Sequence, residues 1–279
     1  MVRICDHFLS IQGEGKRTGI PSLFIRSYGC NMPGCPGFGQ KDPADKSTWE
    51  TPEYSLKVSP KFGCDSPNSW HPMFAKLFHD YKTGQELYNE LAKKYLPQDF
   101  KEIVITGGEP LLHQLFWIEF FEAITSDFVM DYDDVFHITF ETNGSVKIGE
   151  KLEKYIRENM DIKFLFSISP KLNCVAGVNE NISINYDSLN KFVDLFNDNI
   201  IDYQLKFVYN GDERAYNRVN EIINDFHGKI HHEDVMLMPV GGFNVEKEMK
   251  QKTAEICIKE GFRYCERVHV DIWGSKMGV

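Results

Sequence analysis

Residues 83–106, TGQELYNELAKKYLPQDFKEIVIT, contain the helix-then-strand unit on which the predicted fold is based. Thr83 and Glu86 have the spacing of a capping box, and apolar residues then recur at helical intervals, which predicts a helix from about residue 83 to 95. The run EIVI that follows is short, apolar and rich in β-branched residues, as is typical of a buried strand. The segment therefore predicts one helix packed against one strand of a sheet.

The same alternation recurs along most of the chain. We predict further strands at 22–28, 135–140, 164–169, 203–209, 235–240 and 267–273, and further helices at about 111–126, 149–159, 186–198, 212–227 and 244–260. Strands that alternate with helices of this length indicate a parallel sheet, whose ligands gather beyond the carboxyl ends of the strands. Residues 36–72 are rich in proline and lack periodicity, which predicts a long inserted loop within a single α/β domain spanning residues 1–279.

Composition and charge exclude several classes of protein. Of the 279 residues, 42% are hydrophobic, which is enough for a sizeable buried core. The net charge of −10 opposes a broad basic face, so we expect a small-molecule substrate and no direct binding of nucleic acid. The longest apolar runs have the length of strands, so no membrane span is expected. The first residues, MVRICDHFLS, lack the pattern of a secretory signal, and we therefore expect a cytoplasmic protein with reduced thiols.

Three polar motifs directly follow predicted strands. TGGEP at 106–110 combines glycines, which let a backbone approach a ligand closely, with a carboxylate that can bind an ammonium group. ETNGS at 141–145 and SPK at 169–171 follow the next two strands. Each motif alone is also typical of an ordinary turn. Because the carboxyl ends of parallel strands lie at one edge of a sheet, three motifs in succession predict a binding site at that edge.

The segment SIQGEGKRTGIPSLFIR, residues 10–26, carries another set of polar candidates. Gln12 and Glu14 match the donor and acceptor edge of a heterocycle, and Arg26 can hold a carboxylate through two parallel hydrogen bonds. The alternative interpretation is a solvated hairpin that carries a surface arginine. The residue types therefore favour a binding segment, but the segment alone does not decide the question.

The cysteines allow three interpretations. Cys30 follows a predicted strand, Cys35 comes soon after it, and Cys64 lies near the end of the predicted inserted loop. Three thiolates can hold a four-iron four-sulfur (4Fe-4S) cluster and leave one iron open to a substrate or cofactor. The same cysteines with His71 can instead bind zinc in a closed tetrahedral site, and the thiols can also be unrelated to one another.

Taken together, IQGEG, FIR, the cysteines, GGEP, ETNG and SPK resemble the radical S-adenosylmethionine enzymes and, more narrowly, the 7-carboxy-7-deazaguanine synthases. The similarity continues through LKFV, MPVG and VHVDIWGSKMGV, so it spans nearly the whole chain except the insert. In that family the three cysteines lie close together, whereas here CDS at 64–66 closes the motif after the insertion, and Cys30 and Cys35 are one residue farther apart. The resemblance implies an incomplete, open parallel (β/α)6-type barrel.

The resemblance also implies a reaction and its cofactors. A reduced 4Fe-4S cluster donates an electron to S-adenosylmethionine, and the resulting 5′-deoxyadenosyl radical abstracts hydrogen from 6-carboxy-5,6,7,8-tetrahydropterin. The ring contracts with loss of ammonia to give 7-carboxy-7-deazaguanine, which makes the enzyme a lyase of 7-deazaguanine (queuosine-type) biosynthesis. Further implied partners are Mg²⁺, an electron donor such as flavodoxin or ferredoxin, and a second copy of the chain in a homodimer.

Residue roles follow from the same resemblance. It implies that the cluster is held by Cys30, Cys35 and Cys64, and that Ser66 binds Mg²⁺. The implied S-adenosylmethionine-binding residues are Gly63, Asp65, Gly108, Glu109, Ser169, Pro170, Lys171, Met238, Pro239, Val240 and Gly241. The implied substrate-binding residues are Ile11, Gln12, Gly13, Glu14, Arg26, Thr106 and Val279. Gly63 stands where the family has an aromatic residue, so we expect Phe38 or Phe62 to supply that wall of the cofactor site.

Two other functions compete with this one. A glycyl-radical-activating enzyme shares the cluster and GGEP but acts on a polypeptide glycine, and the QGEG and FIR segments argue against it. A zinc-stapled binding module would keep the fold without the chemistry. The joint presence of GGEP, SPK and the Ser66 hydroxyl argues against the module, because a non-catalytic scaffold has little need of all three.

Overall fold

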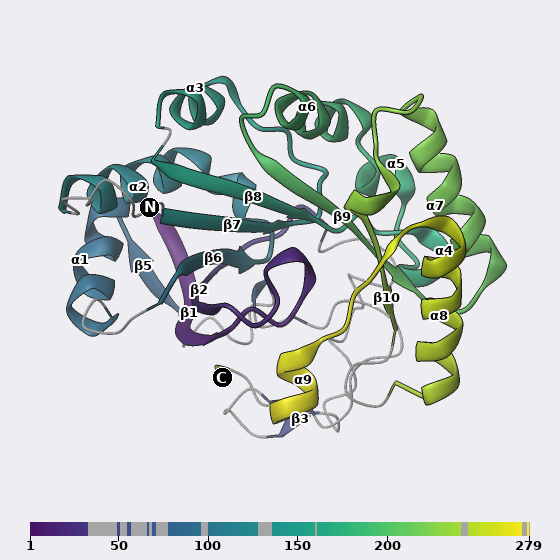
Figure 1. Ribbon diagram of the computed structural model, residues 1–279. Coiled ribbons are helices and arrows are strands. Elements are labelled where there is room, and N and C mark those ends of the chain that lie inside the picture. Colours follow the sequence, from purple (N-terminus) through teal and green to yellow (C-terminus); the bar gives the residue numbers. More distant parts are fainter. Residues whose placement is uncertain are drawn as a thin grey trace.

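The computed structural model describes residues 1–32, 49–50, 55–56, 66, 69–70, 78–95, 100–127, 136–159, 161–240, 245–274 and 278 (Figure 1). In this part of the chain nine strands form one sheet and two short strands pair separately. The strands of the sheet are β1 (Val2–Ile11), β2 (Pro21–Ser27), β5 (His79–Tyr81), β6 (Glu102–Gly107), β7 (Phe136–Thr142), β8 (Ile162–Ile168), β9 (Asp202–Tyr209), β10 (Val235–Pro239) and β11 (Arg263–Tyr264). The separate pair is β3 (Trp49–Glu50) and β4 (Ser55–Leu56).

Helices connect the strands of the sheet. The α-helices are α1 (Gly84–Tyr95), α2 (Gln114–Asp127), α3 (Glu150–Glu158), α4 (Asn173–Ala176), α5 (Glu180–Ser183), α6 (Tyr186–Asn197), α7 (Glu213–Asp225), α8 (Lys247–Glu260) and α9 (Val268–Trp273). In the described ranges the short 3-10 turns are η1 (Gly15–Arg17), η5 (Pro110–His113) and η6 (His232–Asp234). The predicted long helices are thereby confirmed as α1, α2, α3, α6, α7 and α8.

The sheet is mainly parallel and open. Its strand order is β11-β10-β9-β8-β7-β6-β2-β1-β5, and each neighbouring pair from β11 to β2 is parallel. β1 runs antiparallel to both β2 and β5. Within the described ranges the edge strands β11 and β5 do not pair with each other, so the barrel is incomplete. This arrangement confirms the predicted fold class, an open parallel barrel of (β/α)6 type.

The two faces of the sheet differ because side chains alternate along each strand. One face is apolar and packs against the surrounding helices, which lie around the outside of the curved sheet (Figure 1). On this face Phe140 of β7 stacks on Phe166 of β8, and Phe166 contacts Phe192 of α6, with ring centroids 5.2 and 5.1 Å apart. The other face carries polar side chains and is covered by the loop between β1 and β2. The functional candidates therefore lie on the inner face of the half-barrel.

One predicted strand is wrong. Residues 267–273 form the short helix α9, in which the amides of Val270 and Asp271 donate to the carbonyl of Arg267. The sequence RVHVDIW alternates like a strand, but the sheet already ends at β11, and the amide of Val268 donates instead to Gly13 O at 3.0 Å. A short alternating run does not reveal whether a strand partner is present, and among the described residues this stretch has none.

Several short elements were not predicted. These are β1, β3, β4, β5, β11, α4 and α5, of which β3 and β4 lie within the predicted loop. Most of the predicted inserted loop, 36–72, lies outside the described residues. No helix in the described part of the chain is long and apolar enough to cross a membrane.

Candidate active site

A row of polar side chains crosses the inner face of the sheet at one level. Arg26 of β2 pairs in register with Thr106 of β6, and Glu141 of β7 pairs with Ser167 of β8, which pairs with Gln204 of β9. Thr106 and Glu141 meet at the same level, because the residues just before them, Ile105 and Phe140, are register partners. The Gln204 amide donates to Ser167 Oγ at 2.8 Å. The parallel register thus joins side chains from distant motifs into one surface.

The loop after β1 lies over this row. Gln12 is buried, and its amide nitrogen is 3.3 Å from Glu141 Oε1. Its side-chain oxygen accepts from the amide of Glu14 at 3.1 Å. The amide of Lys16 donates to Gln204 Oε1 at 2.7 Å. The predicted substrate segment 11–14 therefore lies directly against strands β7 and β9.

Two glycines let this loop pack closely, Gly15 against β9 and Gly13 against α9. A Cβ on Gly13 would lie 1.8 Å from His269 Nδ1, and a Cβ on Gly15 would lie 2.1 Å from the Gln204 amide nitrogen. Gly15 also has φ of 76°, in the left-handed region that favours glycine. The glycines of QGEG are therefore required by contacts within the protein, a purpose that the sequence alone does not reveal.

Glu14 forms a buried ion pair with Lys206 of β9. Burial by itself would raise the pKa of Glu14, but the positive charges of Lys206, His269 and Arg267 outweigh that effect and lower the pKa to about 2. Burial likewise would lower the pKa of Lys206, but the carboxylates of Glu14 and Glu141 raise it. Both groups are consequently charged near neutral pH, although both side chains are largely buried.

Arg26 does not project into solvent. Its guanidinium donates to Asp6 Oδ2 of β1 at 2.8 Å and lies over the ring of Phe8. β1 and β2 do form the antiparallel hairpin of the alternative interpretation, but the Arg26 side chain is only 16% exposed. A surface arginine is therefore the wrong description of this residue.

Glu109 in the GGEP motif is fully buried at the end of β6. Its carboxylate accepts hydrogen bonds from the amide of Leu111 at 3.0 Å, the hydroxyl of Thr142 at 2.8 Å and the amide of Asn143 at 2.8 Å. Burial raises its pKa to about 7, although these three donors act in the opposite direction. Glu109 therefore joins GGEP to ETNG, two motifs that the sequence placed at the same edge.

The glycines of GGEP pack against the segment that leads into Cys30. Gly107 has φ of 119°, and a Cβ on Gly108 would lie 2.0 Å from Gly29 O. The amide of Glu109 donates to the same carbonyl at 2.8 Å. The sequence predicted that these glycines admit a ligand, and the structure adds that they admit the backbone of the cysteine segment.

Asn31, beside Cys30, links the cysteine segment to the ETNGS loop. Its side-chain amide nitrogen donates to Ser145 Oγ at 2.7 Å, and its side-chain oxygen accepts from the side-chain amide nitrogen of Asn143 at 3.0 Å. Cys30 itself is half-buried and packs with Met32, a residue of a small apolar cluster. The thiol of Cys30 is therefore held at the same strand edge as GGEP and ETNG.

The SPK motif is supported from its outer side. Lys171 donates from Nζ to Ser169 Oγ at 3.0 Å, and Ser183 donates from Oγ to Lys171 O at 2.6 Å. Ser169 and Pro170 are buried. The segment that follows the motif winds through α4 and α5 before α6 begins.

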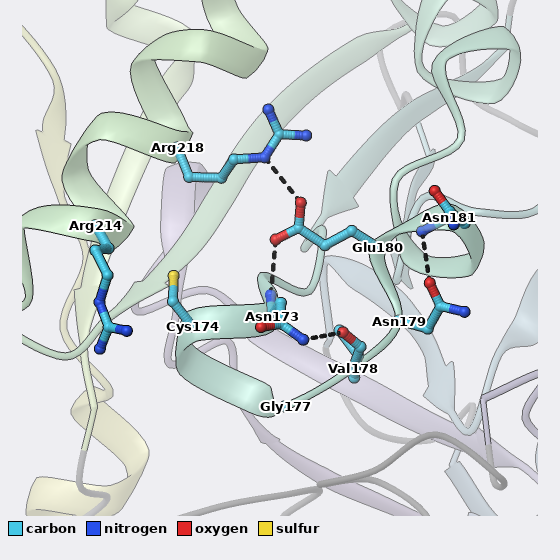
Figure 2. A pocket seen from close by; sticks show the side chains of 9 residues that line it. All are labelled: Asn173, Cys174, Gly177, Val178, Asn179, Glu180, Asn181, Arg214 and Arg218. Carbon is cyan, nitrogen blue, oxygen red and sulfur yellow. Dashed lines mark hydrogen bonds and ion pairs between the residues drawn. The ribbon is translucent and has the colours of Figure 1, made fainter.

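A pocket of about 550 Å³ lies between α4, α5 and α7 (Figure 2). Figure 2 shows Glu180 between two partners: Arg218 donates from Nε at 2.8 Å, and the amide of Asn173 donates at 2.8 Å. The side chain of Asn173 also donates to Val178 O at 2.8 Å. Because these groups satisfy one another, the pocket supports the segment after SPK rather than presenting unpaired groups to a ligand.

The MPVG motif ends β10 on the inner face. Met238 is buried in an apolar cluster with Met236 and Cys265, and the amide of Val240 donates to Tyr209 O at 2.8 Å. Pro239 is the last residue of β10 and is also buried. This part of the inner face is therefore apolar, in contrast to the polar row on β7 to β9.

No protein-family model matches the chain. The chain is 28% identical to the 7-carboxy-7-deazaguanine synthase of Halobacterium salinarum over 98% of this chain and 90% of that relative. It is 24% identical to the 7-carboxy-7-deazaguanine synthase of Rhodopirellula baltica over 99% of this chain and 88% of that relative. The resemblance to this family is confirmed. The crystal structure of QueE from Escherichia coli supports the fold, with a TM-score of 0.60 at 17% identity over 96% of this chain and 94% of that one.

The structure describes only some of the residues to which the resemblance gives a role. Cys35, Gly63, Cys64, Asp65, Gly241 and Val279 lie outside the described residues, as do Phe38, Phe62 and His71. Ser66 is described, and its carbonyl accepts from the amide of Ser69, whose own carbonyl accepts from the amide of Gly29 at 2.8 Å. Within the described ranges no three His, Cys, Asp or Glu side chains converge as a metal site. The end of the CDS motif therefore lies beside the start of the cysteine segment.

Sequence reasoning missed Lys206, Gln204, Ser167 and Asn31. The first three are inner-face residues of β8 and β9, and their signal was the polar residue at every second position of YQLKFVY and FLFSIS. Asn31 had no distinct signal, because a polar residue beside a cysteine is common in loops. The motifs that resemble the family therefore predicted the loops of the site but not the strand residues beneath those loops.

Asn185 supports the ETNGS loop from α6, and this contact is testable. Its side-chain oxygen accepts from the amide of Ser188 as the helix cap, while its amide donates to Ser145 O at 2.9 Å. We expect Asn185→Ala to lower the free energy of unfolding by about 1 kcal/mol in denaturant titrations. Asn185→Ser keeps a capping oxygen and loses the bond to Ser145, so its stability should lie between that of wild type and that of Asn185→Ala. Equal stability of wild type and Asn185→Ala would contradict this role.

Proposed function

We propose that the chain is a radical S-adenosylmethionine lyase that converts 6-carboxy-5,6,7,8-tetrahydropterin to 7-carboxy-7-deazaguanine with loss of ammonia. The observation that carries the proposal is the single polar surface at the carboxyl edge of the sheet, which joins the QGEG loop, GGEP, ETNG and the Cys30 segment. The near full-length similarity to curated 7-carboxy-7-deazaguanine synthases supports the same conclusion.

The residues at this edge fit the implied cofactors. We propose that Cys30, Cys35 and Cys64 hold the 4Fe-4S cluster, since a half-buried thiol at a strand end is an appropriate soft ligand and the Ser66–Ser69 turn lies beside Gly29. The Ser66 hydroxyl is a suitable hard ligand for Mg²⁺. Cluster and S-adenosylmethionine together supply the radical that abstracts hydrogen from the substrate.

The protein's own task is to bind, orient and exclude water. For S-adenosylmethionine we propose two groups of residues from the described chain. Ser169, Pro170 and Lys171 supply polar groups at the end of β8, and Met238, Pro239 and Val240 supply the apolar wall at the end of β10. The Gly108 backbone and Glu109 fix the geometry between these walls and the cysteine segment. Gly63, Asp65 and Gly241 belong to the same proposal.

For the pterin we propose the polar row and the loop above it. Gln12 and Glu14 supply an amide and a carboxylate, which suit the amino-pyrimidinone edge of a pterin. Ile11, Gly13, Arg26, Thr106 and Val279 complete the proposed substrate contacts. Since Arg26 holds Asp6 in this structure, binding of a substrate carboxylate there would require the guanidinium to be shared or exchanged. A single domain, a homodimer, an electron donor such as flavodoxin or ferredoxin, and a cytoplasmic location are further proposals.

The function is tested by anaerobic reconstitution with iron and sulfide, followed by incubation with the carboxytetrahydropterin, S-adenosylmethionine, Mg²⁺ and a reductant. We expect a deazapurine product that carries the substrate carboxylate, together with released ammonia. A reconstituted cluster without any deazapurine would overturn the assignment. Zinc in place of iron and sulfide in anaerobically purified protein would instead support a non-catalytic, zinc-stapled module.

A further inference from the structure

Lys206 is a buried cation on the inner face of β9. Its side chain is 8% exposed, and its ammonium pairs with Glu14, whose side chain is 15% exposed. Taking both charges out of water carries a large penalty, which only close pairing offsets. Glu141 is the other carboxylate whose charge acts on Lys206. A buried charge at the centre of a site is unnecessary for a barrel fold, since an apolar residue could occupy this strand position at lower cost.

The loop that carries Glu14 is already anchored without Lys206. Lys16 donates from Nζ to Asp202 at 2.7 Å and to Asp234 at 2.8 Å, which fixes the loop beside β9 and β10. Arg17 pairs with Glu102 of β6 at 2.7 Å on the other side. These contacts tie the loop to β6 on one side and to β9 and the turn before β10 on the other. The Lys206 pair is therefore an addition to a loop whose backbone position is set by other residues.

The chemistry of the pair acts on the Glu14 side chain itself. Lys206 contacts Oε2, which leaves Oε1 to accept a hydrogen bond from a ligand N–H. The ionised carboxylate is the stronger acceptor, because both of its oxygens accept and neither donates. Burial would otherwise favour its protonated form, in which one oxygen becomes a donor. An amino-pyrimidinone edge presents N–H donors, so it is bound better by the ionised form.

From this arrangement we infer that Lys206 is a positioning residue that holds the Glu14 carboxylate ready to accept hydrogen bonds from the amino-pyrimidinone edge of the substrate. The inference rests on the proposed function for the identity of that substrate. Lys206 makes no contact with the reacting atoms in this role. LKFV is one of the segments that resemble the family, but it reads as an ordinary strand, and the resemblance gave Lys206 no role.

The charges around Glu14 come from two elements. Lys206 faces it from β9, and Arg267 and His269 act on it from the C-terminal segment that packs on Gly13. Cys265, buried beside the pair, adds a group that titrates only at high pH, because burial raises the pKa of its thiol to about 11. Since Lys206 is the strongest of the charges that favour ionised Glu14, its removal should raise the pKa of Glu14 even while Arg267 and His269 remain.

The test compares wild type with Lys206→Met, Lys206→Arg and Lys229→Met. Lys229 forms an exposed ion pair with Asp194 and serves as the control. We expect Lys206→Met to raise the KM for the carboxytetrahydropterin at least about 10-fold while kcat changes less than about threefold. Lys206→Arg should recover most of this loss, and Lys229→Met should behave as wild type. The pKa of Glu14, followed by NMR of ¹³C-labelled glutamate and assigned with Glu14→Gln, should rise in Lys206→Met.

A double variant keeps the inference testable if Lys206→Met folds poorly. Lys206→Met combined with Glu14→Gln leaves neither charge unpaired, and Lys206→Met should cause no further rise in KM when Glu14 is already Gln. An equal rise in both backgrounds, or an unchanged KM and Glu14 pKa in Lys206→Met, would overturn the role. Wild type that is inactive on the pterin would overturn the proposed function instead, and the Glu14 pKa would still report whether Lys206 controls this carboxylate.

Discussion

Replacing Cys30 with alanine should abolish turnover, with a loss of at least about 1,000-fold, because the chemistry has no route without the cluster. In the proposed site three thiolates hold the cluster and leave one iron open, so removal of the Cys30 ligand would leave the cluster incompletely held. Cys30 packs against the apolar cluster of Met32, Ala176 and Val178, so the smaller alanine side chain fits the same surroundings. The loss should therefore appear in the cluster and in activity, with little change in the free energy of unfolding.

Iron and sulfide analysis, with the visible absorbance of the reconstituted protein, measures the first effect, and product formation measures the second. Cys174→Ala is the matched control, since Cys174 is a partly exposed thiol in the outer pocket and matches no cluster motif. It should keep both cluster and activity. A Cys30→Ala protein with wild-type iron content and turnover would contradict the proposed cluster ligand.

The fold was predictable where a segment was long and its pattern periodic. The helix and strand within 83–106 are such a case, and α1 and β6 lie where the pattern placed them. The pattern failed in 267–273, since a helix of this length and a strand can share the same alternation, and the outcome depends on a partner elsewhere in the fold. β1 was missed as a strand because Asp6 and His7 interrupt its apolar alternation, at the point where its register with β2 shifts between Ile4 and Asp6.

The parts of the site that lie in loops were predictable, because they carry recognisable motifs. GGEP and ETNG were placed at one edge from sequence, and the bonds from Thr142 and Asn143 to Glu109 join them there. The inner-face residues could not be assigned in the same way. Lys206 lies far along the chain from Glu14, and only the register of the sheet and the path of the loop bring the two together.

Glu109→Ala should lower the free energy of unfolding by about 4 kcal/mol. Together with the loss of turnover in Cys30→Ala, this is the largest effect that we expect of a single substitution. The change removes the acceptor used by the amides of Leu111 and Asn143 and by the hydroxyl of Thr142, all in a fully buried place. It also leaves a cavity beside the turn. Since these bonds hold ETNG against GGEP, the variant should lose cluster occupancy as well. Denaturant unfolding with unchanged slope measures the stability, and wild-type stability would contradict the role.

The pH dependence of stability distinguishes the effect of ionising Glu109 from the effect of its size and packing. Burial raises the pKa of Glu109 from 4.5 to about 7, so the folded protein holds this proton more tightly than the unfolded chain does. The stability that comes from this difference is complete below about pH 4.5 and is lost as the pH rises through 7. A shift of this size corresponds to about 3 kcal/mol. Glu109→Gln cannot titrate, and its amide opposes one of the donors at every pH, so it carries a constant penalty. In the cluster-free protein, the stability difference between wild type and Glu109→Gln should therefore shrink from pH 5 to pH 8, and a difference that stays constant would show that Glu109 does not titrate in this range.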